Sequence, residues 1–160
     1  MEEPKDTFDY SDCDYCDRFE EVISDSGNRI GIADVGGMFA DPGPKWVSAL
    51  MALRNRIVGC FGLKADAVPA DGKPRVGVFE VLGQTDQTMI LGEDDKHLDF
   101  RIQLSLTHDG GGDRKRVTVT TLVRYHNRLG HIYFFFVRPF HRMIVPAVMK
   151  RRLRQLAVRV

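Results

Sequence analysis

The sequence predicts an α+β fold built on an antiparallel β-meander that runs from about Arg75 to His126. Two segments with strict apolar–polar alternation flank a glycine-rich loop, which is typical of a hairpin with one buried face. Before and after the meander, apolar residues recur at helical spacing instead. Because 160 residues, 43% of them hydrophobic, are enough for one core, we expect a single domain over residues 1–160.

Three elements are expected before the meander. Tyr15 to Ile23 carries apolar residues among acids and predicts a first, edge strand. Arg29 to Phe39 predicts a short helix, which the breaker Asp41-Pro42-Gly43-Pro44 ends. A second helix then begins at Pro44, because apolar residues recur every three or four positions. Its predicted buried stripe consists of Trp46, Leu50, Leu53, Ile57 and Phe61, and Gly62 is the expected C-cap.

Short strands open the meander. After a predicted surface loop from Lys64 to Pro74, β-prone runs at Val76 to Leu82 and Thr88 to Leu91 predict two strands. Each of these strands is followed by residues with the composition of a turn, at 83–86 and 92–96.

The centre of the meander is a long hairpin. Its first strand alternates from Leu98 to Leu106, and its second, beyond a loop at residues 109–113, alternates from Val117 to Tyr125. If Leu106 faces Val117, Leu98 meets Tyr125, and the apolar faces coincide along the whole hairpin.

Alternation also predicts one polar face on this hairpin, with Asp99 beside Arg124 and His97 beside His126. A histidine, an orienting carboxylate and an arginine for a developing anion are groups that acid–base enzymes use. The candidate catalytic residues are therefore His97, Asp99, Arg101 and His126. The alternative is cross-strand pairing on a solvated face, worth about 0.2–1 kcal/mol per pair. A face turned away from the predicted core favours that alternative.

The C-terminal segment is ambiguous on pattern alone. Ile132 to Val137 has strand composition, whereas its flanks are helical, with Asn127 as an expected N-cap. Phe140 to Val148 predicts an amphipathic helix in which Pro139 and Pro146 cause kinks or breaks.

Charge is separated along the chain. The formal net charge is only +1, which argues against a dedicated nucleic-acid binder, yet acids crowd the start, including the acidic segment 1–14, and bases crowd the end. The basic segment from Lys150 to Arg159 suggests peripheral binding to an anionic membrane or a protein. No signal sequence opens the chain and its longest apolar run is short, so we expect a cytoplasmic protein without an integral membrane segment.

Motifs for metals and cofactors are missing from the sequence. Cys13 and Cys16 form a CxxC without a second ligand pair, and the surrounding acids are expected to raise the thiol pKa values. His131 and His141 diverge by about 80° on a helix, which disfavours a shared metal. No phosphate-binding glycine loop or GxSxG motif appears, so we expect neither metal nor cofactor.

Six short motifs occur in an order and spacing that resemble a known family. They are Pro44-Lys45-Trp46-Val47, Leu53-Arg54-Asn55, Phe61-Gly62-Leu63, Asp95-Lys96-His97-Leu98-Asp99-Phe100-Arg101, His126-Asn127-Arg128-Leu129-Gly130 and Arg138-Pro139-Phe140-His141. The chain resembles, over roughly Asp14 to Arg152, the uncharacterised bacterial domain-of-unknown-function family 2867 of the START-like (SRPBCC, helix-grip) superfamily.

The resemblance implies a curved antiparallel sheet of about five strands wrapped around a long C-terminal helix, with one or two helices inserted after the first strand. It favours helix for Leu129 to Arg138 and implies a cavity between sheet and helix for a small apolar or amphipathic ligand. The expected ligand-binding residues are Trp46, Phe100, Ile102, Val123, Tyr125, Tyr133, Phe136 and Phe140. An enzyme on the same scaffold is the alternative function, and a homodimer is left open.

Overall fold

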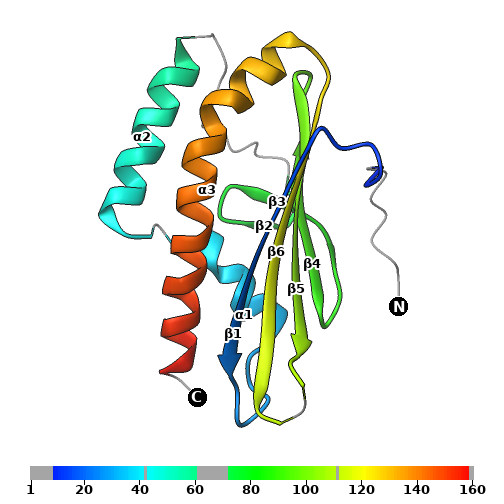
Figure 1. Ribbon diagram of the computed structural model, residues 1–160, viewed down its shortest axis with the longest axis vertical. Helices are drawn as coiled ribbons and strands as arrows, with labels where there is room; N and C mark the ends of the chain where they lie inside the picture. Colours follow the sequence, from blue (N-terminus) through cyan, green and yellow to red (C-terminus); the bar gives the residue numbers. More distant parts are fainter. Residues whose placement is uncertain (1–8, 42, 61–71, 111, 159–160) are drawn as a thin grey trace.

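The fold is a six-stranded antiparallel sheet with helices packed on one face (Figure 1). It is a computed structural model, which describes residues 9–41, 43–60, 72–110 and 112–158. Spatial strand order is β1-β6-β5-β4-β3-β2, so the first strand pairs with the last. The predicted α+β fold, with a long C-terminal helix and helices inserted after the first strand, is confirmed.

The elements follow one another as a strand, a group of short helices, five strands and a long helix. Their bounds are β1 Tyr15–Ser24, α1 Ile32–Gly36, the 3-10 helix η1 Gly37–Phe39, α2 Lys45–Gly59, β2 Arg75–Val76, β3 Phe79–Gln84, β4 Thr88–Asp94, β5 Leu98–His108, β6 Arg114–Tyr125 and α3 Arg128–Ala157.

The predicted register of the central hairpin is confirmed. In β5 and β6, Leu106 faces Val117 and Leu98 faces Tyr125. A register fixed by two matching apolar faces leaves little choice, because a slip of one residue would expose every apolar side chain of one strand.

Two predictions for the short strands are wrong. Val76 to Leu82 is not one strand, because Gly77 adopts a φ of +62° and turns the chain between β2 and β3. This turn makes six strands instead of about five. Gly92 is not in a turn but inside β4, opposite Arg101, where a Cβ atom would clash with the Phe100 backbone carbonyl oxygen and lie 2.8 Å from Arg101 Cδ. This glycine leaves room for the neighbouring backbone and for the arginine side chain.

The C-terminal segment is one helix, α3, as the family resemblance implied. Asn127 caps it by accepting a hydrogen bond from the backbone N–H of Gly130 at 3.1 Å. Pro139 and Pro146 lie inside the helix without ending it. Packing of the helix on the sheet compensates for the backbone hydrogen bonds that the prolines remove. Figure 1 shows the first turns of α3 inclined to the rest of the helix.

Two groups of buried side chains fill the space between the sheet and α3. We call the larger the main core; it joins the C-terminal half of α3 to the sheet and to α1, and includes Val35, Leu104, Val119 and Met149. The smaller, the upper cluster, consists of Leu98, Val123 and Phe134. Phe100 packs against both groups.

Helix α2 is present as predicted, but the prediction of which of its residues are buried is wrong. Trp46 and Leu53 are 44% and 47% exposed, whereas Val47 is buried. α2 packs beside α3 and not on the sheet, so it buries only a narrow stripe (Figure 1). The predicted Phe61 and Gly62, and most of the predicted loop after them, lie outside the described residues, as does the side chain of Ile57.

Candidate functional site

Three polar side chains point inward where apolar ones are expected. Asp17 on β1 and Thr121 on β6 are cross-strand partners on the face that α3 covers. His141 on α3 follows the buried Phe134 by seven residues and precedes the buried Val145 by four, which places it on the same helical face. The sheet and the helix therefore bring polar groups together between the main core and the upper cluster.

These groups form a hydrogen-bonded unit with Tyr15. The Tyr15 hydroxyl donates to Asp17 Oδ2 at 2.6 Å, and His141 Nε2 lies 3.0 Å from the same oxygen. The side chains of Asp17 and His141 are each 13% exposed. The buried hydroxyl of Thr121, opposite Asp17 on β6, also helps to keep the pKa of that carboxyl group low. We call Tyr15, Asp17, Thr121 and His141 the inner polar cluster.

Burial and hydrogen bonding set the protonation states of this cluster. Burial raises the pKa of Asp17, but hydrogen bonds from His141 and Tyr15 outweigh it and hold the pKa below its ordinary value. Burial, with the neighbouring Asp17 carboxylate, raises the pKa of Tyr15 to about 12. At neutral pH, Asp17 is therefore ionised and Tyr15 keeps its proton.

A groove of about 510 Å³ opens beside this cluster, between the end of β6 and the first turns of α3. Its lining is Tyr125, His131, Ile132, Phe134, Phe135, Phe136 and Arg138. We call it the aromatic groove. It joins the inner polar cluster through Tyr15, whose ring lies 4.7 Å from that of Phe134 and 5.1 Å from the guanidinium carbon of Arg138.

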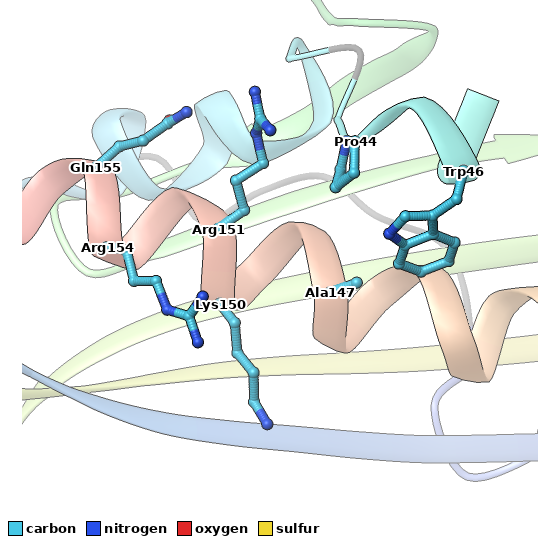
Figure 2. A pocket seen from close by; sticks show the side chains of 7 residues that line it. All are labelled: Pro44, Trp46, Ala147, Lys150, Arg151, Arg154 and Gln155. Atoms are coloured by element: carbon cyan, nitrogen blue, oxygen red, sulfur yellow. The ribbon is translucent and has the colours of Figure 1, made fainter.

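A second groove, of about 580 Å³, lies between the start of α2 and the C-terminal half of α3. It is lined by Pro44, Trp46, Ala147, Lys150, Arg151, Arg154 and Gln155. Figure 2 shows the Trp46 ring beside Ala147, with Arg151 and Gln155 pointing to one side of α3 and Lys150 and Arg154 to the other. We call it the basic groove.

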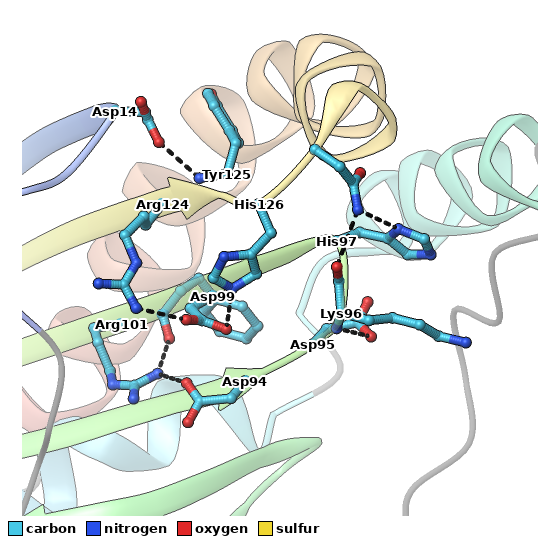
Figure 3. A network of polar contacts seen from close by, with 12 residues as sticks. Asp14, Asp94, Asp95, Lys96, His97, Asp99, Arg101, Arg124, Tyr125 and His126 are labelled. Carbon is cyan, nitrogen blue, oxygen red and sulfur yellow. Dashed lines mark hydrogen bonds and ion pairs between the residues drawn. The ribbon is translucent and has the colours of Figure 1, made fainter.

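The predicted catalytic candidates lie on the opposite face of the sheet, where the structure brings only some of them together (Figure 3). Asp99 binds both Arg124, at 3.1 Å, and His126, at 2.9 Å. Arg101 instead donates to Asp94 at 2.7 Å. His97 precedes β5, so strand alternation does not orient it, and its ring contacts the side chain of Asn127 at 3.2 Å.

This face is less solvated than the sequence predicts. Asp99 is 7% exposed and Arg101 only 2%. Burial raises the pKa of Asp99, but hydrogen bonds from His126 and Arg124 outweigh it and lower the pKa. An ionised Asp99 can orient His126 for proton transfer. Because neither groove is lined by these residues, we interpret the network as a link that ties β5, β6 and the start of α3 together.

The eight predicted ligand-binding residues do not share one place. Ile102 and Val123 are buried in the core, and Phe100 lies between its two parts. Tyr125 and Phe136 line the aromatic groove. Trp46 lines the basic groove, because α2 packs beside α3.

The last two predicted residues, Tyr133 and Phe140, are half-buried on α3.

The sequence analysis did not predict Asp17, His141 or Arg138 as candidate site residues. The signal for two of them was a polar residue at an inward position: Asp17 alternates with Tyr15, and His141 repeats Phe134 after seven residues.

Cysteine and metal chemistry receive no support from the geometry. Burial, then Cys13 and Asp17, raise the pKa of Cys16, which is the direction expected from the acidic surroundings. In the described ranges, no group of three or more His, Cys, Asp or Glu side chains is arranged to hold a metal ion.

Helix α3 is long and apolar enough to cross a membrane by length and composition. A single such helix is weak evidence for a membrane span, since the central helix of a folded domain meets the same criterion.

Residues 9–148 match the family described as Protein of unknown function (DUF2867). No curated protein matches the chain.

Proposed function

The chain belongs to the DUF2867 family, and we propose that it binds a small amphipathic molecule with an anionic head in the aromatic groove. The observation that carries this proposal is the junction of that groove with the inner polar cluster. Membership of the START-like superfamily, whose helix-grip arrangement agrees with this sheet and helix, is part of the same proposal.

The groove suits the apolar part of such a molecule. Its volume of about 510 Å³ lies within the range of roughly 300–1,000 Å³ that is usual for small-molecule sites. Four of its seven lining residues are aromatic rings of Phe or Tyr. Phe135 is 74% exposed, so a bound hydrocarbon would remove a large ring from water.

Arg138 suits an anionic head. It is the only permanently charged residue in the groove lining, where His131 is the other ionisable base. The Tyr15 ring packs against its guanidinium group, which limits the directions in which Arg138 can point. A guanidinium held in this way can bind a carboxylate through two parallel hydrogen bonds.

The inner polar cluster supports the choice of this end of α3. Burying a charged carboxylate and its polar neighbours in an apolar interface is unfavourable, and their hydrogen bonds offset only part of the cost. A role in binding explains why the cluster is buried at this place. Asp17 and His141 fix Tyr15, and Tyr15 in turn positions Arg138 for the ligand. The family resemblance implied a ligand between the sheet and the long helix, and in the C-terminal half of α3 the main core occupies that space.

Titration calorimetry with a matched pair of ligands tests the proposal. Dodecanoate should bind, and dodecanol, which has the same chain without the charge, should bind roughly tenfold or more weakly because it lacks the charge-assisted hydrogen bonds. The substitution Arg138→Gln should remove this preference. The same change at Arg154, which lines the basic groove, should leave it intact.

Two outcomes contradict the proposal. One is equal binding of dodecanoate and dodecanol by the unmodified protein. The other is unchanged dodecanoate affinity in both Arg138→Gln and Phe135→Ala, provided that each variant unfolds at the same urea concentration as the parent.

A further inference from the structure

The two longest helices, α2 and α3, carry only positive charge. The sequences of α2 and α3 contain no Asp or Glu, but three and seven Lys or Arg residues respectively. Since the formal net charge of the whole chain is +1, the rest of the chain carries an excess of acids. Some cations of the helices pair with acids of the sheet, as Lys150 on α3 does with Glu21 on β1 at 3.5 Å. The protein is therefore polarised, with its helices on the positive side.

The outward side of α3 is apolar where a surface helix is normally polar. Leu129 and Ile132 are each 42% exposed, Met143 is 55% exposed and Phe135 is 74% exposed. Only 22% of the most apolar 18-residue stretch of α3 is buried. Lys150 and Arg154 continue this outward side towards the C-terminus.

Helix α2 extends the apolar surface. It lies beside α3 and exposes Trp46, Met51 and Leu53. Trp46 also lines the basic groove, whose cations Lys150, Arg151 and Arg154 lie further along α3 (Figure 2). An indole that shares a surface with cations is typical of the boundary between lipid headgroups and hydrocarbon.

We propose that this helical face docks the protein reversibly on the surface of a bilayer that contains anionic lipid. The exposed apolar side chains of α3 and α2 enter the headgroup boundary, while Lys150 and Arg154 contact lipid phosphates. The helix lies on the membrane and does not span it, because its other side holds the main core together through Val145 and Met149. The absence of acids from both helices favours an anionic surface over a neutral one.

Vesicle sedimentation of the whole chain tests this proposal. The protein should sediment with vesicles of equimolar phosphatidylglycerol and phosphatidylcholine, should stay in solution with phosphatidylcholine alone, and should be released by high salt. Trp46 is the single tryptophan, so its fluorescence should shift to shorter wavelength on binding. No added label is needed.

Variants outside the aromatic groove separate this proposal from ligand binding. Lys150→Gln with Arg154→Gln should weaken vesicle binding roughly 25-fold, at about fivefold per cation. Leu129→Ser with Met143→Ser should weaken it roughly tenfold or more. Matched controls on the opposite sheet face are Arg18→Gln and Val22→Ser, whose side chains are exposed and should leave binding unchanged.

Three results overturn the proposal. They are no sedimentation with anionic vesicles, equal sedimentation with both vesicle types, and variants of the helical face that bind as the parent does. Light scattering tests whether the helical face instead forms a dimer interface. A stable dimer that Met143→Ser converts to monomer would show that a second copy of the chain, and not a membrane, covers this face.

Discussion

The two halves of α3 pack on the same sheet but bury different amounts of side chain. In the C-terminal half the buried residues are Val145, Val148, Met149, Leu153 and Leu156. In the N-terminal half, only Gly130 and Phe134 are buried, and Phe135 is largely exposed. His141 stands between the halves and bonds to Asp17 where packing would favour an apolar residue.

This difference separates stability from function. A close-packed interface excludes ligands, so the inward side of the C-terminal half supports the fold, and only its outward side, which lines the basic groove, remains accessible. The N-terminal half keeps enough core to hold its position, through Phe134 and the upper cluster, while exposing aromatic surface beside polar groups. Poor packing at one end of a helix lowers the stability of a protein. Such a loss is typical of binding sites, where function requires an accessible surface.

The largest effect should follow from breaking the buried ion pair at the end of the sheet where β1 ends and β6 begins. Lys115 Nζ lies 2.7 Å from Asp25 Oδ2 and donates to the Ile30 carbonyl, and both charged side chains are buried. Lys115→Ala leaves the buried Asp25 without a counter-charge, although the backbone N–H groups of Arg29 and Ile30 still donate to it, so the free energy of unfolding should fall by about 3–5 kcal/mol. Urea denaturation measures this loss.

A lysine on the surface provides the control for that experiment. Lys73 pairs with Glu80 at 2.9 Å, but its side chain is 53% exposed, and Lys73→Ala should cost no more than about 1 kcal/mol. Similar losses for the two lysine variants would mean that the Asp25 pair is not what stabilises this end of the sheet.

Two methionines on α3 compare its inner and outer sides directly. Met149 is fully buried in the main core, so Met149→Ala should lower the free energy of unfolding by about 2–5 kcal/mol. Met143 is 55% exposed, and Met143→Ala should change stability by no more than about 0.5 kcal/mol. Urea midpoints for both variants check this. A large loss at Met143 would show that its side chain is covered in solution.

Replacing the inner polar cluster tests whether it serves binding or folding. In Asp17→Val with His141→Leu, apolar side chains take the place of a buried polar pair, and stability should stay the same or rise by about 1–4 kcal/mol. Dodecanoate binding should weaken, because Tyr15 loses the partner that fixes it beneath Arg138. His141→Leu alone should destabilise, since Asp17 keeps its charge without its partner. A double variant that is much less stable than the parent would assign the cluster to folding.

Most of the fold could be predicted because it rests on local patterns. The alternation of β5 and β6 fixed both the strands and their register, and Asn127 marked the start of α3. Two β-strand details failed because a glycine does not reveal which role it has. Gly77, predicted inside a strand, adopts a left-handed φ and forms a turn, whereas Gly92, predicted in a turn, lies inside a strand where the Phe100 carbonyl and Arg101 leave no room for a Cβ atom.

The candidate site was predicted less well because it depends on how elements pack. The polar residues of the hairpin were visible in the sequence, but they line neither of the two grooves described above. Asp17 and His141 are 124 residues apart, and only the docking of α3 on β1 brings them together. Trp46 was assigned to the core because its spacing is helical, yet a helix packed on another helix leaves that side exposed.

The smallest effect is a change in stability confined to high pH, caused by Tyr15. The ordinary pKa of tyrosine is 10.0, and burial with the Asp17 carboxylate raises that of Tyr15 to about 12. Because the unfolded chain loses this proton first, the contribution of Tyr15 is complete below pH 10 and is lost as the pH rises towards 12. Spectroscopic titration of the tyrosinates should therefore show a late phase that Tyr15→Phe removes. Tyr125→Phe, which alters the neighbouring wall of the groove, should leave the phase near pH 12 in place, and its loss there would move the buried hydroxyl from the inner polar cluster to the groove.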